Sequence, residues 1–209
     1  IEHTTKNDVI KADCAYYIAN SAVRLNQQNA DGLILDFVKK YPTSTKRNTA
    51  FMDVADYYFE NSRFSYARKW YDKVDEEALA KNEREKFFFN YGYSFYATKN
   101  AQGAKKYLSR VENSKTYGAQ AKYYIGYMAY EGDDYDKATQ YFDQVSGTEK
   151  YKEGFSYYQA DLNFKLGNFE KAIELAKEQL PNSDANEVSE LSKIIGESYF
   201  NLEKYEEAI

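Results

Sequence analysis

The sequence has few of the residues that most often bind metals or serve in nucleophilic catalysis. Its 209 residues include one cysteine, one histidine and two prolines. A single cysteine, Cys14, excludes both an intrachain disulfide and a zinc site built from several thiolates. The scarcity of proline favours helices broken by turns over a strand-and-loop fold. No run reaches the roughly 18 apolar residues that a membrane helix needs, so we expect no membrane-spanning segment in this chain.

Net positive charge is also lacking, because the formal charge is −5 at pH 7. A protein whose main work is gripping phosphate backbones is usually basic, so we do not expect a nucleic-acid partner. The charge is uneven. Residues 61–122 carry 13 Lys/Arg against 7 Asp/Glu, whereas residues 170–209 carry 4 against 10. This asymmetry could steer a charged partner, and a solvated helix surface explains it equally well.

Aromatic residues are abundant instead, with 23 tyrosines and 13 phenylalanines, and a short pattern recurs around an alanine. Successive copies are separated by 34 to 37 residues. The alanines are Ala30, Ala67, Ala104, Ala138, Ala172 and Ala208. Twelve residues before them stand Ile18, Ala55, Gly92, Gly126, Ala160 and Gly196. Apolar residues four and seven places after each alanine lie on one helix face. The pattern therefore predicts pairs of helices that approach closely at small residues.

Each predicted helix pair has one apolar side that it cannot bury alone, so it must stack on a neighbour of the same kind. Turns such as "EGDD", "LGN" and "TKN" separate the two helices of a pair. Stretches such as "GYMAYEGDDYDKATQYFDQV" and "GESYFNLEKYEEAI" resemble the tetratricopeptide repeat (TPR). The resemblance implies an all-α fold, a right-handed superhelical solenoid of antiparallel helix pairs with about five and a half repeats.

The predicted organisation is a single array over residues 1–209. Its repeat units lie near 11–45, 48–82, 85–118, 119–152, 153–186 and 189–209. Because the chain begins at Ile1 and ends inside the pattern, we expect it to be a piece of a longer protein.

One linker carries a narrower resemblance. Residues 37–74 are similar to repeats of bacterial envelope proteins, namely outer-membrane-assembly lipoproteins and the periplasmic Tol-system TPR protein. In those proteins a helix ends in a Tyr-Pro-x-Ser turn, and Tyr41, Pro42 and Ser44 match it. The resemblance implies a periplasmic or outer-membrane-associated location and a role in cell-envelope assembly. A cytoplasmic location remains the alternative.

Candidate catalytic and metal-binding residues are few. His3 lies beside the chain start, where we expect a surface or disordered residue. Cys14 falls on a position that the repeat pattern assigns to an apolar core residue, so we expect it to be buried. "GESYF" (196–200) resembles the segment around the catalytic glutamate of lytic transglycosylases, with Glu197 as the acid, but its neighbours follow the repeat. "EGDDYD" lacks the spacing of a calcium loop. We therefore expect no enzyme activity, no metal site and no cofactor.

The first helix of each unit carries a second face, at positions 15, 11 and 8 before the alanine. In the family this face lines the concave side, and here it is mainly aromatic in units three to five. We predict that it forms a groove that binds a peptide segment or another partner protein. The predicted partner-binding residues are Phe89, Tyr93, Tyr96, Tyr123, Tyr127, Tyr130, Tyr157 and Asp161. Interhelical packing is the competing interpretation, above all for Phe59, Tyr96, Tyr130, Phe164 and Phe200.

Two other functions fit the same face. Tyrosine rings stack on sugars, and Asp56 and Asp161 could accept hydroxyl hydrogen bonds, so a glycan-binding module is the alternative partner class. A plain spacer with no ligand is the third. A clamp for a C-terminal carboxylate, which some family members have, is not expected because Tyr, Phe, Ala and Asp occupy its positions.

Overall fold

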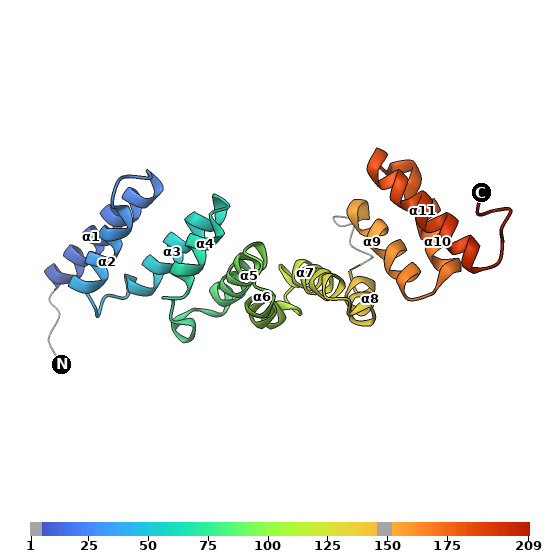
Figure 1. Cartoon of the computed structure of the whole chain (residues 1–209). Helices are drawn as coiled ribbons and strands as arrows, with labels where there is room; N and C mark the ends of the chain where they lie inside the picture. The colour runs from blue at the N-terminus through green and yellow to red at the C-terminus, as the bar shows by residue number, and fades with distance from the viewer. Residues whose placement is uncertain (1–5, 146–151) are drawn as a thin grey trace. The chain divides into compact units, whose positions relative to one another are not determined.

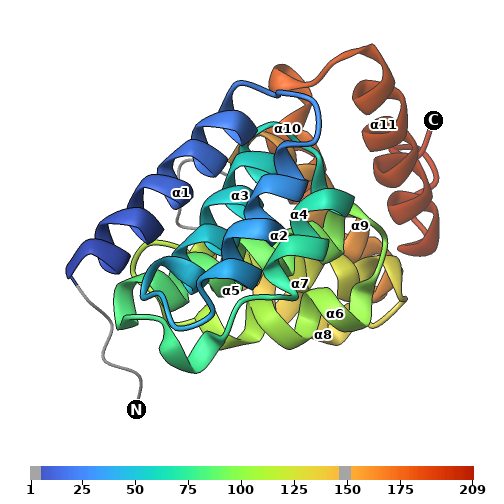
Figure 2. The ribbon, with the colours of Figure 1, turned by 90° about the vertical axis from the view of Figure 1, so that its left-hand side faces the viewer.

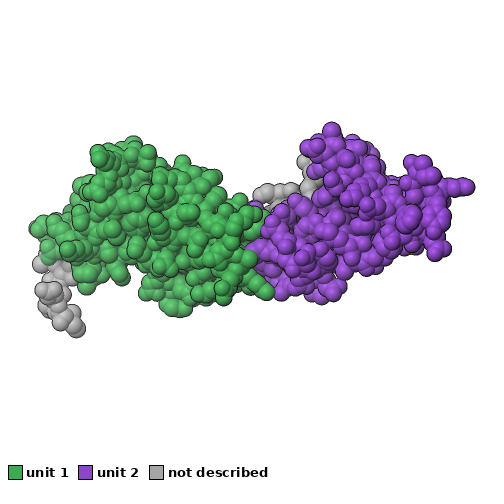
Figure 3. All heavy atoms as spheres, viewed as in Figure 1, with its two compact units in different colours: residues 1–111 green, residues 112–209 purple. Residues whose placement is uncertain are grey.

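The computed structural model describes residues 6–145 and 152–209 (Figure 1). Over these ranges the chain is helical and contains no strand. The chain forms two compact units, residues 1–111 and 112–209 (Figure 3), and each is described by itself below. The expectation of one array over the whole chain stays a prediction. His3 and the junction at 146–151 lie outside the described residues.

Unit 1 contains three helix pairs in chain order. Their bounds are α1 Lys6–Arg24, α2 Ala30–Lys40, α3 Lys46–Glu60, α4 Phe64–Tyr71, α5 Lys81–Ala97 and α6 Ala101–Leu108, with short 3-10 helices at η1 Glu76–Ala78 and η2 Ser109–Val111. Each helix packs on its partner, and the first helices also contact one another, α1 with α3 and α3 with α5. Figure 2 shows α1 and α3 lying side by side. Unit 1 is therefore a stack of hairpins.

Unit 2 contains two helix pairs and one further helix. Its elements are α7 Gly118–Glu131, α8 Tyr135–Asp143, α9 Lys152–Lys165, α10 Phe169–Gln179, η4 Leu180–Asn182 and α11 Ala185–Asn201. The pairs α7/α8 and α9/α10 pack internally, α8 contacts α9, and α11 packs on both α9 and α10.

Small residues let the paired helices approach, as the repeat pattern predicts. Ala67, Ala104, Ala138 and Ala172 are fully buried. A Cβ atom added to Gly92 would lie 2.8 Å from Cγ of Leu108, and one added to Gly126 would lie 2.8 Å from Cδ1 of Phe142. Such distances are too short for any side chain at these two positions. Glycine is thus required by the close contact of one helix with the second helix of its own pair.

The turn inside the hairpin repeats as faithfully as the alanine does. Five residues before the alanine, the backbone adopts a left-handed conformation at Ser62, Lys99, Asp133, Gly167 and Glu203, with φ between 57° and 78°. In each case this residue's N–H bonds the carbonyl three residues back, and the next N–H bonds the carbonyl five residues back. These two bonds define the Schellman ending of a helix. The helices α3, α5, α7, α9 and α11 therefore stop in the same way.

The expectation that Cys14 is buried is wrong, because Cys14 is exposed on α1. Ile18, at the small-residue position of the first hairpin, is likewise exposed. In the first pair the same turn lies at Asn26, four residues before Ala30 instead of five. Positions counted back from Ala30 therefore fall off the buried face of α1, which carries Tyr16, Ala19 and Val23.

Candidate partner-binding surface

Many tyrosines of this chain donate their phenol hydrogen to a carboxylate on a neighbouring element. The pairs join Tyr16 to Asp53, Tyr58 to Asp31, Tyr71 to Asp56, Tyr91 to Asp72, Tyr130 to Asp161 and Tyr141 to Glu112. Most of these bonds connect one hairpin with the next, and so they hold the stack together. A tyrosine in such a pair stabilises the fold, and its phenol is therefore less available to a partner.

In unit 1 the predicted residues gather in one ring cluster on α3, α4 and α5. Tyr93 is half-buried between Phe59, at a centroid distance of 5.7 Å, and Phe64, at 5.3 Å. It also contacts Tyr96 at 5.8 Å and stacks on Phe89 at 6.3 Å. Phe89 is only 7% exposed. Phe89 therefore supports Tyr93 from below, and Tyr93 and Tyr96 provide the accessible part of the cluster.

In unit 2 the predicted residues lie on α7 and α9. Tyr123, Tyr127 and Tyr130 follow one face of α7 at helical spacing, with Tyr123 and Tyr127 stacked at 6.4 Å and 21° between ring planes. Tyr158 of α9 meets Tyr127 edge-on at 5.3 Å and Tyr130 at 5.5 Å. All are half-buried, as is Tyr157. We call Tyr123, Tyr127, Tyr130, Tyr157 and Tyr158 the tyrosine face.

A charged network fixes one edge of the tyrosine face. Oδ2 of Asp161 accepts the hydrogen bond of the Tyr130 phenol and lies 3.0 Å from Nζ of Lys165. The Lys165 ammonium also lies over the Tyr130 ring, 4.5 Å from its centroid, and over the Tyr135 ring at 5.1 Å. Burial and the bond to Asp161 raise the pKa of the Tyr130 phenol. Burial lowers the pKa of Lys165, but its bonds to Asp161 and Tyr130 outweigh this and raise it.

The rest of the face is uncharged at neutral pH. Burial and the neighbouring Tyr158 raise the pKa of Tyr127 to about 12, and burial raises the pKa of Tyr157. Tyr123 and Tyr127 also pack on the core formed by Ala138, Phe142, Val145 and Leu162. The rings are therefore held in place from below while part of each remains open to solvent. Such rigid aromatic surface binds with little loss of side-chain entropy.

The two aspartates on which the glycan alternative depends are already occupied. Asp56 accepts hydrogen bonds from Tyr71 at 2.5 Å and Asn90 at 3.1 Å, and it pairs with Lys86 at 2.8 Å. Asp161 is occupied by Tyr130 and Lys165. Both carboxylates already accept hydrogen bonds within the chain, so these contacts do not support a glycan partner.

Sequence reasoning missed these two networks. Asp56 and Asp161 both stand eleven residues before their alanine, on an otherwise aromatic face, and a carboxylate in that setting signals a buried partner. Glu197 is exposed on α11 beside Phe200 and Tyr205. Across residues 6–145 and 152–209, no group of three or more His, Cys, Asp or Glu is placed to hold a metal ion. Within the same ranges, no helix is long and apolar enough to span a bilayer.

Comparisons with known proteins agree with this architecture. The tetratricopeptide repeat family model matches residues 120–146, which contain most of α7, all of α8 and three residues of the tyrosine face. A MamA structure (AMB-1) is 19% identical, with a TM-score of 0.66 over 78% of this chain and 86% of that one. PilF of Pseudomonas aeruginosa is 17% identical, with a TM-score of 0.57 over 94% and 86%.

A tetratricopeptide repeat protein from Parabacteroides merdae is 14% identical, with a TM-score of 0.60 over 94% of this chain and 75% of that one. No curated protein matches the chain. At these identities the likeness shows the fold, and the matched repeat at 120–146 recurs along the chain in the buried alanines and the five identical turns. Residues 120–146 therefore match the tetratricopeptide repeat, and the described residues share the fold of such proteins, antiparallel helix pairs in series.

Proposed function

We propose that the chain is a protein-interaction scaffold whose tyrosine face binds a polypeptide segment of a partner. The observation that carries the proposal is the set of half-buried rings on α7 and α9, fixed by edge-on and stacked contacts and by the Asp161–Lys165 network. Aromatic residues held rigidly in this way are typical centres of binding energy. The Tyr93–Tyr96 cluster of unit 1 is a second surface of the same chemistry.

A partner segment would gain most at Tyr127 and Tyr157. The Tyr130 phenol donates to Asp161, whereas Tyr127 lies at the centre of the ring contacts, stacked on Tyr123 and edge-on to Tyr158, and Tyr157 is half-buried beside them. These rings offer apolar area, and a tyrosine phenol can exchange hydrogen bonds with a backbone carbonyl. A segment with an apolar side chain and an exposed backbone carbonyl matches both properties.

The experiment is selection of peptides from a displayed library on the purified chain, followed by calorimetry of the selected peptides. Tyr127→Ala and Tyr157→Ala should each weaken binding about thirtyfold, the effect of a hot-spot residue of about 2 kcal/mol. Tyr205→Ala is the matched control, because Tyr205 is an exposed tyrosine of the same unit outside the face. Peptides that bind all three variants as well as the parent chain would overturn the proposal.

We also propose a location in the cell envelope, with a role in envelope assembly. Its support is the turn after α2, where Ser44 N–H donates to the Tyr41 carbonyl at 3.0 Å and Ser44 Oγ accepts from Lys46 N–H at 3.2 Å. The first contact closes a turn after α2 and the second lies at the start of α3, so the linker has the form of a tight turn between two helices, as in the resembled proteins. Protease accessibility of the natural protein in spheroplasts tests the location, and protection from protease in intact spheroplasts would refute it.

A further inference from the structure

Three cations at or next to α4 lie over aromatic rings without an acidic partner among the described residues. The guanidinium of Arg63 lies 4.8 Å from the Tyr58 centroid and 4.5 Å from the Tyr66 centroid. The ammonium of Lys69 lies 5.2 Å from Tyr66, and the guanidinium of Arg68 lies 4.1 Å from Phe95. Elsewhere in the unit Arg84, Lys86 and Arg110 are paired with carboxylates, whereas Lys46 and Arg47 also lie over rings; among the described helices, only α4 gathers three such cations. The rings orient the α4 cations but do not neutralise them.

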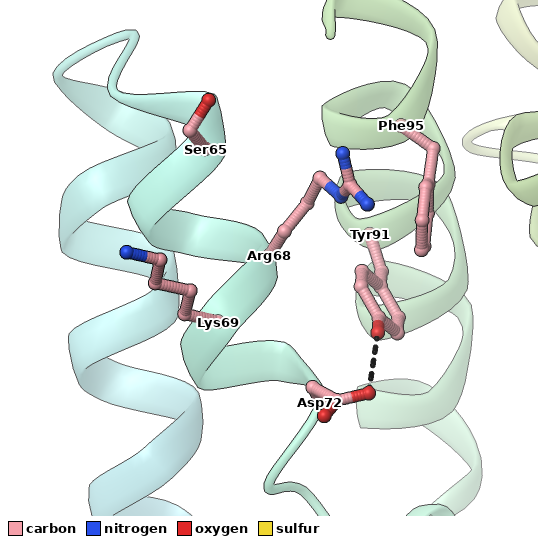
Figure 4. A pocket seen from close by; sticks show the side chains of 6 residues that line it. All are labelled: Ser65, Arg68, Lys69, Asp72, Tyr91 and Phe95. Carbon is pink, nitrogen blue, oxygen red and sulfur yellow. Dashed lines mark hydrogen bonds between the residues drawn. The ribbon is translucent and has the colours of Figure 1, made fainter. Parts of the chain in front are cut away.

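A hollow of about 420 Å³ opens beside Arg68, between α4 and α5. Figure 4 shows Arg68 reaching from α4 toward Phe95 and Tyr91 of α5, while Asp72 receives the Tyr91 phenol at the far end. Lys69 points away on the other side of α4 and lines the hollow with its stem. A second hollow of about 320 Å³ adjoins it, lined by residues that include Ser62, Arg63 and Ser65. The two hollows share Ser65 and are both lined by residues of α4 and α5, and together we call them the groove.

Arg68 is not satisfied by its own chain. Nη1 donates to Oγ1 of Thr98 at 2.8 Å, but the buried Nε has no hydrogen-bond partner among the described residues. An unpaired buried donor costs stability. A guanidinium that stacks on a ring and keeps unused donors is an arrangement suited to carboxylate or phosphate oxygens.

We propose that this groove, defined by Ser62, Arg63, Ser65, Arg68 and Phe95, binds an acidic segment of a partner polypeptide, with a Glu or Asp carboxylate on the guanidinium of Arg68. Charge complementarity carries the choice of occupant. Residues 61–122 hold an excess of six positive charges in a chain of net charge −5. The carboxylate of Asp72 at the far end opposes a doubly charged phosphate there, whereas a polypeptide can place a backbone N–H against it.

This site is separate from the tyrosine face, since it lies in unit 1 and uses charge where the tyrosine face uses ring surface. The two proposals can therefore fail independently. A partner that uses the groove would show a strong dependence on ionic strength, because its two cations are an exposed Arg63 and a half-buried Arg68.

The test is titration of the full chain with a fluorescent glutamate-rich decapeptide, with its glutamine counterpart as the uncharged probe. We expect saturable binding of the glutamate peptide alone, weakened about tenfold or more by Arg68→Gln and by at least threefold by Arg63→Gln. The matched control is Arg47→Gln, which removes another ring-stacked arginine of unit 1, over Phe51 and outside the groove.

Arg63→Gln keeps the test decisive if Arg68→Gln does not fold, which circular dichroism will show. Equal binding of the two peptides, an equal loss in Arg47→Gln, or no saturable binding would overturn the proposal. Inorganic phosphate or heparin that displaces the glutamate peptide at far lower concentration than free glutamate would also overturn it, because the groove would then select phosphate or sulfate.

Discussion

The phenol of Tyr71 donates a hydrogen bond of 2.5 Å to Oδ1 of Asp56 in the interior of unit 1. The two residues come from α4 and α3, and the side-chain amide of Asn90 adds a third helix, α5, through its bond to the same oxygen. Asp56 is 9% exposed, and burial raises the pKa of Tyr71 well above its ordinary value. One carboxylate thus joins two consecutive hairpins.

Replacing Asp56 tests this joint. Asp56→Ala leaves the Tyr71 phenol, the Asn90 amide and the Lys86 ammonium without their acceptor, so we expect a loss of about 3 kcal/mol in the free energy of unfolding. Tyr71→Phe removes one donor and leaves the others paired, and should cost about 1 to 2 kcal/mol. Urea unfolding followed by the fluorescence of Trp70, the single tryptophan and a buried residue of unit 1, measures both.

The control for this pair is Asp36→Ala, which removes an exposed carboxylate of α2. It should change the unfolding free energy by less than about 0.5 kcal/mol. An Asp56→Ala variant as stable as the control would show that the network contributes nothing.

The contact of Gly126 with Phe142 gives a second prediction. Gly126→Ala places a methyl group 2.8 Å from two carbons of the Phe142 ring, so α7 and α8 must separate or the ring must move. We expect a loss of about 1 to 3 kcal/mol, as for other overpacked cores, measured by thermal unfolding of the helical circular dichroism signal.

Gly132→Ala is the matched control for Gly126→Ala. Gly132 ends the same helix, and a Cβ there would meet nothing closer than 3.3 Å, so its unfolding temperature should stay near that of the parent chain. Similar temperatures for the two variants would contradict the close-packing argument.

The helix pairs were predictable because their determinants are local. Ala67, Ala104, Ala138 and Ala172 are small at nearly fixed spacing and are all fully buried, so a regular period in the sequence predicts a close contact between helices. Cys14 and Ile18 were not predictable in this way. The turn of the first pair lies four residues before Ala30 instead of five, so a count taken from the alanine misplaces the residues of α1 by one position.

The candidate surface was predictable only in part, for a related reason. Helical spacing places Tyr123, Tyr127 and Tyr130 on one face, and the structure brings their rings together. The spacing does not indicate which phenol already donates a hydrogen bond to a carboxylate. Tyr130 finds Asp161 across 31 residues, and that pairing depends on the rotation of α9 against α7, which no local pattern specifies.

Alkaline pH should destabilise unit 1 through its buried phenols. Burial and the hydrogen bond to Asp31 raise the pKa of Tyr58 to about 12, from 10.0 for a free side chain. Below pH 10 both states keep the proton and the stabilisation is complete. Between pH 10 and about 12 the unfolded chain releases it while the folded chain retains it, so the free energy of unfolding falls as the pH rises.

Urea unfolding by Trp70 fluorescence at several values in this range should show a shallower decline for Tyr58→Phe than for the parent chain. Tyr17→Phe is the control, since Tyr17 is an exposed tyrosine of the same unit. The same decline in all three proteins would show that deprotonation of Tyr58 does not lower the free energy of unfolding.

The shared turn gives a prediction in the stabilising direction. Ser62 occupies the left-handed region with φ of 57°, a conformation that costs a residue with a Cβ roughly 1 to 2 kcal/mol. Glycine adopts it freely, although it also gives the unfolded chain more freedom. We therefore expect Ser62→Gly to raise the unfolding free energy of unit 1 by about 0.5 to 1 kcal/mol, measured by Trp70 fluorescence.

The reciprocal change is Gly167→Ser in unit 2, where φ is 78° and no atom would lie within 4 Å of the added Cβ. It should lower stability by a similar amount through backbone strain alone, and a stabilising Gly167→Ser would refute the common turn.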